Sequence, residues 1–396
     1  MSQPYKPPPG ILSGAAFLMA VSAIGPGFLT ATTQFTVKLG ASLAFAILLS
    51  TVIDIGAQMN TWRVIGVSKK RGNEVADAVF PGLGFLITFV IVVGSFIFNV
   101  GNLGGCALGL DALLGLPQEA GIVLSGLLAI GLFLLPQMLK GMDWFTKILG
   151  ISMLGITLYV VIVTRPPISE AALRAVSPEK IDIGIIVTLI GGTIGGYIMF
   201  SGAHRLLDGG VGGKEHVHII TQASIQGIVI TGVMRMMLFL AVLGVVAVGS
   251  TIGNERPVFD AFKAGAGQVG FVLSGLVFWA AAITSVVGCS YTSISFLGLT
   301  PGSKRRAWAI IAFTVLGVAV TLAARWSGWE ATPMLILAGR INGILLPLIF
   351  GVILLAAHRR SIMGDYHHPL WASLFGLFAW LTTLFMAGWT VWLMMK

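Results

Sequence analysis

Long runs of apolar residues, separated by short polar segments, follow one another along nearly the whole chain. Each run holds about 20 residues, the length that a helix needs to cross a hydrocarbon core about 30 Å thick. Lipid offers no hydrogen-bond partner to the backbone, so a helix is the element that satisfies the backbone within each run. The pattern predicts an all-α membrane protein of about eleven transmembrane helices, at residues 11–34, 41–64, 82–110, 120–138, 143–164, 183–203, 223–249, 268–297, 307–324, 333–356 and 370–394.

Two of the predicted spans are interrupted near their centres. In the first span, Pro26 stands between Gly25 and Gly27, and the sixth span carries two glycine pairs, 191–192 and 195–196. Proline removes a backbone donor, and glycine tolerates unwound dihedral angles. Broken helices at matching positions of two halves are typical of transporters with inverted repeats, in which the unwound backbone holds the substrate. Close packing of small residues between helices is the alternative reading for either cluster alone.

The spacing of the breaks suggests a domain organisation. The two broken spans lie five helices apart, which predicts a first five-helix repeat at 11–164 and a second, inverted repeat at 165–356. A loop and an eleventh helix follow at 357–396, and a polar tail precedes the first span at 1–10.

Composition narrows the class of protein. Hydrophobic residues make up 56% of the chain and charged residues only 10%, against roughly a quarter charged in soluble domains. The net charge of +9 would suggest nucleic acid in a soluble protein, but here the bases lie between apolar runs and orient the chain. We therefore expect a lipid bilayer and a small solute as partners, and no nucleic acid. The oligomeric state stays open.

The distribution of bases predicts the orientation. Lysine and arginine near helix ends are retained on the cytoplasmic side. The alternate loops that carry more of them hold Lys6, Arg63, Lys69, Lys70, Arg71, Lys140, Lys147, Arg205, Lys214, Lys304, Arg305, Arg306, Arg359 and Arg360. We expect a multi-pass protein of the bacterial inner (plasma) membrane, with the N-terminus in the cytoplasm and the C-terminus outside.

Several segments resemble the Nramp family of divalent-metal transporters. Gly25-Pro26-Gly27-Phe28 stands where that family has Asp-Pro-Gly-Asn, and Gln34 falls at the spacing of a family glutamine. The segments 141–144 and 357–366 are similar to the family's start of helix 5 and to the loop after its helix 10. The resemblance implies the LeuT-type fold of two inverted five-helix repeats plus an eleventh helix, and it implies ion-coupled transport.

The same resemblance shows where this chain departs from the family pattern. The positions at which the family ligates its metal or moves protons read Gly25, Phe28 and Gly195 for ligands, Asn99 and Asn102 for the acidic pair, and Tyr197 for the histidine. A dehydrated divalent cation without carboxylates would lose more solvation than amides and carbonyls restore. We therefore expect no metal site and no cofactor. The predicted substrate-binding residues are Gly25, Pro26, Gly27, Phe28, Gly192, Gly195, Tyr197, Asn99 and Asn102.

Few charges lie deep within the spans. Asp54 is the one deep carboxylate, and Arg235 and Arg340 are the deep bases. Intramembrane charges usually pair with one another or face a cavity. If Asp54 pairs with one arginine in a structural lock, the other is left to hold an anionic group, because guanidinium binds carboxylates well. These three residues are the candidates for charge coupling, with H⁺ or Na⁺ as the coupling ion.

The other polar groups inside the spans have simpler readings. The eighth span is rich in hydroxyls, among them Ser285, Ser290 and Ser293, which could help to bind sodium or could bond their own backbone. Cys106 and Cys289 form no motif typical of a metal site or a disulfide, so we expect both to be small buried residues.

The leading hypothesis is an ion-coupled secondary transporter of a small solute that is not a transition metal, with a small anion as the candidate. A transporter of partly hydrated Mg²⁺ or Mn²⁺ is the first alternative. A passive channel is the second alternative, and a membrane enzyme is the third. No nucleophile-base arrangement or nucleotide-binding glycine loop is present, so we do not expect an enzyme.

Overall fold

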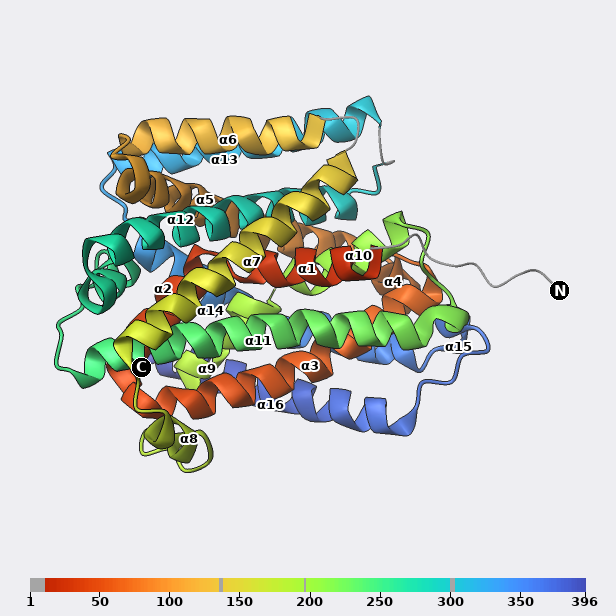
Figure 1. Ribbon diagram of the computed structural model, residues 1–396. Helices are drawn as coiled ribbons and strands as arrows, with labels where there is room; N and C mark the ends of the chain where they lie inside the picture. Colours follow the sequence, from red (N-terminus) through yellow and green to blue (C-terminus); the bar gives the residue numbers. More distant parts are fainter. Residues whose placement is uncertain (1–10, 135–137, 196, 300–302) are drawn as a thin grey trace.

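The computed structural model describes residues 11–134, 138–195, 197–299 and 303–396. The predicted tail at 1–10 and Gly196 lie outside these ranges. Within them every regular element is helical, which confirms the all-α class (Figure 1). The elements are α1 (Ile11–Ala23), α2 (Pro26–Leu39), η1 (Gly40–Ser42), α3 (Leu43–Ser68), α4 (Gly72–Val79), α5 (Leu83–Leu114), α6 (Gln118–Leu134), α7 (Met138–Thr164), α8 (Ile168–Val176), α9 (Ile183–Thr193), α10 (Ile198–Asp208), η2 (Lys214–His216), α11 (Val217–Ala247), α12 (Pro257–Phe296), α13 (Lys304–Trp326), α14 (Ala331–Ala357), α15 (Arg360–Met363) and α16 (Leu370–Met395).

The predicted spans correspond to helices of the structure. Among the described residues, 9 helical stretches are long and apolar enough to cross a membrane, and one of them, Pro26–Ser68, contains both α2 and α3. Two shorter apolar helices, Leu12–Ala23 and Gln118–Leu134, account for the rest of the expected set. Both predicted breaks are present, because α1 ends before α2 begins and α9 ends before α10 begins.

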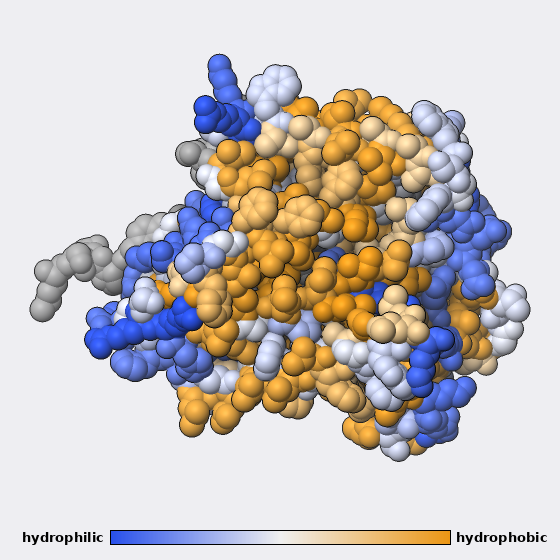
Figure 2. All heavy atoms as spheres, turned by 180° about the vertical axis from the view of Figure 1, so that it is seen from behind, coloured by the Kyte–Doolittle hydropathy of each residue, from blue (hydrophilic) through white to orange (hydrophobic). Residues whose placement is uncertain are grey.

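The surface agrees with a membrane-spanning chain. Figure 2 shows a broad apolar band across the middle of one face, with hydrophilic residues gathered at its two edges. Large apolar side chains such as Phe85, Ile151 and Phe385 are exposed on membrane-spanning helices. Such exposure is expected where lipid, and not water, covers the protein.

Several short elements were not predicted. Helices α4 and α8 lie in segments predicted to be loops, because short helices with charged positions such as Glu74 and Glu170 lack a long apolar run. The eighth span was predicted to begin at residue 268, whereas α12 begins at Pro257 and bends at Ala266 and Gly267. Gly267 has a φ of 63°, a left-handed conformation that glycine adopts without strain.

The four half-helices lie in the interior of the bundle. Helices α5 and α12 pack along each other, α14 packs against α9, and α11 packs against α1 and α3. Helices α6 and α13 lie side by side at one edge, and α16 covers α14 and α3 (Figure 1). The surrounding helices therefore enclose both breaks.

The helices define two ends of the molecule. We call the end that carries segments 69–71, 205–216 and 358–360 the basic end, and the end that carries 40–42, 250–256 and 327–330 the opposite end. Helix α1 begins at the basic end, and α16 finishes at the opposite end (Figure 1). Which end faces the cytoplasm stays a prediction.

Candidate functional site

The break between α1 and α2 follows from the chemistry of Pro26. In a continuous helix residue 26 would donate to the carbonyl of Ser22, but proline has no N–H to donate. Ser285 of α12 supplies the missing donor, because its Oγ donates to Ser22 O at 2.9 Å. The neighbouring Thr284 donates to Val21 O at 3.3 Å. Helix α12 therefore supplies hydrogen bonds to carbonyls that the break leaves free.

A compact polar group surrounds this break. A Cβ added to Gly25 would lie 2.6 Å from Ser285 Oγ and 3.3 Å from Asn102 Oδ1, so the backbone approaches both side chains closely. Asn102 of α5 donates its Nδ2 to Cys289 Sγ at 3.6 Å. The hydroxyl of Tyr197 lies beside Cys289 and Asn102. We call Gly25, Asn102, Tyr197, Ser285 and Cys289 the break site.

The break site is buried and keeps unused polar atoms. Its four side chains are at most 1% exposed. Asn102 Oδ1 has no hydrogen-bond partner among the described residues, whereas the Tyr197 hydroxyl lies beside Cys289 and Asn102. Buried polar atoms usually have partners, so an unpaired oxygen here is consistent with a place where another molecule or ion binds.

The N-terminal end of α2 adds hydrogen-bond donors. Gly25 caps this helix in an extended conformation, without a side-chain hydrogen bond. The first N–H groups of a helix have no partner within the helix and carry partial positive charge. The break site therefore combines backbone donors with neutral oxygen and sulfur atoms, and no carboxylate belongs to it.

A second group forms at the C-terminal end of α9. Arg235 of α11 donates to Thr193 Oγ1 at 2.7 Å and to Leu189 O at 3.4 Å. Its guanidinium lies 4.1 Å from the centre of the Phe28 ring. Asp54 of α3 lies near both Arg235 and Thr193. A positive charge at the C-terminal end of a helix is favourable. Arg235 therefore stabilises the end of α9 at this break.

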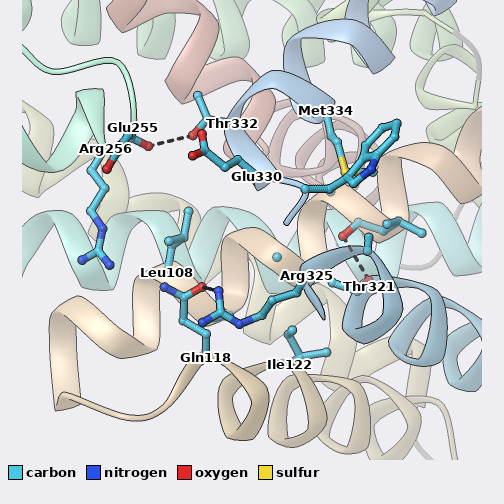
Figure 3. Close-up of a pocket in the computed structure, with 16 residues that line it drawn as sticks. Leu108, Gln118, Ile122, Glu255, Arg256, Thr321, Arg325, Glu330, Thr332 and Met334 are labelled. Atoms are coloured by element: carbon cyan, nitrogen blue, oxygen red, sulfur yellow. Dashed lines mark hydrogen bonds between the residues drawn. The ribbon is translucent and has the colours of Figure 1, made fainter. Parts of the chain in front are cut away.

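Two adjoining cavities lie at the opposite end. The first, shown in Figure 3, has a volume of about 210 Å³ and lies between α5, α6, α13 and the first turns of α14. Among its lining residues Arg325 donates to Gln118, and Thr332 donates to Glu255 O at 3.0 Å. Arg325 also donates to Glu119 Oε1 at 2.6 Å. Ion pairs and hydrogen bonds therefore engage several of its polar side chains.

The second cavity contains Arg340. It has a volume of about 350 Å³ and shares Glu255, Glu330 and Thr332 with the first, and it is also lined by Gln34 and Arg340. Arg340 Nε is buried and has no partner among the residues that the structure describes. Gly339, the preceding residue, packs against Thr188 of α9. The residue that precedes Arg340 on α14 therefore contacts α9, the helix that leads to the second break.

The structure separates some residues that the sequence analysis grouped. Asn99 does not join the break site, because it faces α13, where a Cβ at Gly317 would lie 2.6 Å from its Nδ2. Gly191 and Gly195 pack tightly, since a Cβ at these positions would lie 1.9 Å from Gly339 O and 2.2 Å from Gly191 O. By contrast, Gly192 has open space where its Cβ would be. The close-packing alternative thus accounts for two of the glycines of the sixth span, and a part of any of them in binding stays a prediction.

Cys289 and Asn342 were not predicted to belong to a binding site. Cys289 is buried as expected, yet it also accepts a hydrogen bond from Asn102. Asn342 of α14 lies against Gly195 and Gly94, and its Nδ2 has no partner in the described part of the chain. Of the hydroxyls on α12, Ser285 bonds α1 as described, whereas Ser290 and Ser293 are buried without partners in that part. A polar residue within an apolar span was the available signal for each of them.

No metal cluster is evident in the described ranges. They contain no group of three or more histidine, cysteine, aspartate or glutamate residues that could hold a metal ion. The oxygen and sulfur atoms of the break site are the polar ligands that the structure places at the α1–α2 break.

Comparisons with known proteins relate the whole chain to one family. The family model described as natural resistance-associated macrophage protein-like (Nramp) matches residues 16–396. The uncharacterized membrane protein YcsG of Bacillus subtilis is 49% identical over 365 residues, covering 92% of this chain and 89% of YcsG. An uncharacterized membrane protein of Haemophilus influenzae is 45% identical over 381 residues, covering 96% of this chain and 95% of its own length.

Solved structures share the fold. The manganese transporter of Eremococcus coleocola matches with a TM-score of 0.73 at 16% identity, covering 95% of this chain and 85% of that protein. MhsT in complex with L-phenylalanine matches with a TM-score of 0.67 at 14% identity, covering 94% of this chain and 96% of MhsT. These matches confirm the expected LeuT-type arrangement of broken helices.

Proposed function

Because the chain belongs to the Nramp family, we propose that it is a secondary active transporter whose substrate is a small anion and not a transition-metal ion. Members of this family are transporters and not enzymes, and two broken helices inside a bundle suit alternating access. The coupling ion is H⁺ or Na⁺. Two cavities lie at the opposite end, so a solute would approach the site from that end in this conformation.

The observation that carries the proposal is the neutral chemistry of the break site. Gly25 leaves no side chain at the first helix break, and the buried groups beside it are an amide, a phenol, a hydroxyl and a thiol. A divalent cation stripped of water would meet no carboxylate there and would lose most of its hydration energy. A carboxylate or similar anion would meet the free N–H groups of α2 and its partial positive charge.

The arrangement of the arginines supports the same reading. Arg235 is engaged by Thr193, by the α9 carbonyl of Leu189 and by the nearby Asp54. Arg340 lines the second cavity with a buried Nε that no described residue pairs. Guanidinium binds carboxylates through paired hydrogen bonds, so Arg340 can attract an anion before it reaches the break site.

A divalent-cation transporter is the second candidate, and a specific observation favours it. Glu255 and Glu330 are exposed at the mouth of the cavities, where two carboxylates attract cations. The structural match to a manganese transporter agrees with that reading. A dication that keeps part of its hydration shell could bind neutral ligands, as Mg²⁺ often does.

A ligand screen on the purified protein separates the two candidates. Small carboxylates, inorganic oxyanions, Mn²⁺ and Mg²⁺ are each added, and the melting temperature is recorded. A ligand at 100 times its dissociation constant stabilises the folded state by about 2.7 kcal/mol. We expect one class of small anion to raise the melting temperature and the two cations to leave it unchanged. Stabilisation by Mn²⁺ or Mg²⁺ alone would favour the second candidate.

Arg340→Gln then tests the proposed contact. Loss of a hydrogen bond to a charged group costs about 1.5–3 kcal/mol, which weakens affinity roughly tenfold or more. Lys180→Gln is the matched control, because Lys180 is an exposed base at the same end and does not line either cavity. Equal loss of affinity in both variants would mean that general positive potential, and not Arg340, attracts the anion. Loss of folded Arg340→Gln protein would show that Arg340 has a structural role.

A further inference from the structure

A buried ionic cluster closes the basic end of the molecule. Asp208, the last residue of α10, accepts hydrogen bonds from Arg71, which precedes α4, and from Tyr291 of α12 at 2.6 Å. Arg306 of α13 lies 3.4 Å from the second carboxylate oxygen. We call these four residues the Asp208 cluster. It ties the second half of the broken helix, α10, to three other elements.

The charges of the Asp208 cluster do not balance. Two guanidiniums face one carboxylate, and the side chains of Arg71, Arg306 and Asp208 are 17%, 5% and 3% exposed. One terminal nitrogen of each arginine, Nη1, is buried without a hydrogen-bond partner in the described part of the chain. An uncompensated buried charge costs several kcal/mol. Both free nitrogens therefore offer hydrogen bonds to an anion.

The cluster stands close to the break site along α12. Tyr291 follows Cys289 by two residues, about 3 Å of helix rise. Around Tyr291, the hydroxyls of Ser290, Thr292 and Ser293 are buried, and the described residues provide them with no hydrogen-bond partner. These unsatisfied hydroxyls lie on the stretch of α12 that joins the break site to the Asp208 cluster.

We propose that the Asp208 cluster is an anion-binding gate at the basic end, which a small oxyanion opens by replacing Asp208 on Arg71 and Arg306. An oxyanion presents two oxygens to guanidinium, as the Asp208 carboxylate does. Once replaced, Asp208 no longer holds α10 against α13 and the start of α4. Separation of α10 from α13 then opens the break site to solution at the basic end. The proposal does not depend on which solute is transported.

Cys289 provides a native reporter for this opening. It is 0% exposed in the break site, and Cys106, the other cysteine of the chain, is also 0% exposed. In a Cys106→Ala background, a small water-soluble methanethiosulfonate reagent reacts only at Cys289. The rate of modification is measured in chloride, in acetate and in inorganic phosphate at equal ionic strength, with detergent-purified full-length protein.

We expect acetate or phosphate to raise the rate of Cys289 modification relative to chloride, on the order of fivefold or more, the low end of typical coupling between sites. Acceleration by one anion and not the other identifies a carboxylate-type or a phosphate-type ligand. Tyr291→Phe should raise the rate in chloride and keep the response to the anion, because both arginines remain. Arg306→Gln should abolish the response.

Arg305→Gln is the matched control, since Arg305 is the exposed neighbour of Arg306 and the substitution removes the same charge. It should behave like the parent protein. Should Arg306→Gln fail to fold, Arg71→Gln at the more exposed arginine replaces it. Identical rates in all three anions, or equal effects of Arg305→Gln and Arg306→Gln, would overturn the proposal. Arg340→Gln should leave the response intact, which separates this gate from the proposed transport function.

Discussion

Replacing Gly25 with alanine probes the closest approach in the break site. The new Cβ would lie 2.6 Å from Ser285 Oγ, so the hydroxyl must rotate away. Rotation breaks its hydrogen bond to Ser22 O, which is 2.9 Å long in the structure. That carbonyl cannot regain an intrahelical partner, because residue 26 is proline. The perturbation therefore falls on one identified hydrogen bond.

The magnitude follows from two opposing effects. A buried carbonyl left without a partner costs about 1–3 kcal/mol. Gly25 has φ of −86° and ψ of 177°, which alanine adopts without strain. The substitution also reduces the conformational freedom of the unfolded chain, which stabilises the folded state by about 0.4–1 kcal/mol. The net expectation for Gly25→Ala is a loss of roughly 1 kcal/mol of stability. Ser285→Ala breaks the same hydrogen bond and should cost about 1–3 kcal/mol.

The double variant gives the sharper result. Gly25→Ala and Ser285→Ala remove one and the same hydrogen bond, so their costs should not add. We expect the double variant to be at least as stable as Ser285→Ala alone. The assay is the melting temperature from tryptophan fluorescence, for which the chain offers 10 tryptophans. A change of 1 kcal/mol shifts the melting temperature by about 2–4 °C in chains of 150–250 residues, and by less in longer ones.

Gly131→Ala is the control for the glycine substitution itself. Gly131 lies in α6, and a Cβ added there would meet no neighbouring atom within 4 Å. Its replacement should stabilise the helix by up to about 1 kcal/mol and should add to Ser285→Ala without coupling. If Gly25→Ala and Ser285→Ala turn out to be additive, the contact between α1, α2 and α12 is not the one described.

Two further predictions concern stability. Gly191→Ala should prevent accumulation of folded protein, because the new Cβ would lie 1.9 Å from the backbone oxygen of Gly339. Gly192→Ala, where the Cβ would enter open space, should fold normally. Comparable yields of the two variants by size-exclusion chromatography would contradict the described packing. Burial, followed by the nearby basic groups, lowers the pKa of His368 to about 4. The neutral imidazole therefore stabilises the folded state fully above the unfolded pKa of about 6.5. This stabilisation is lost as the pH falls toward the folded value. His368→Gln, which can still hydrogen bond to Asn60, should flatten the melting temperature between these pH values, and an unchanged slope would assign the dependence to other groups.

The sequence predicted the break of the first span because the cause is local. Pro26 between two glycines cannot continue a helix in any surroundings. The long apolar spans were likewise predictable from their length. Short helices such as α4 and α8 were not predicted, since their stability depends on what they pack against and not on an apolar run of their own.

The composition of the site could be predicted only in part. Asn99 and Asn102 lie three residues apart on α5, a spacing that places both on one side of a helix. The neighbours decide their roles, because Asn102 meets α2 and α12 while Asn99 meets α13. The partner of Asp54 was likewise undetermined by sequence, and the structure places Arg235 beside it. A single chain carries no signal of which helices pack together.

Uptake into proteoliposomes tests the central claim most directly. The purified protein is reconstituted, and uptake of Mn²⁺ is measured beside uptake of the small anion that stabilises it in the ligand screen. We predict saturable uptake of the anion, lost in Asn102→Ala, and no Mn²⁺ uptake above that of protein-free liposomes. Saturable Mn²⁺ uptake that Asn102→Ala abolishes, with no uptake of the anion, would contradict the account.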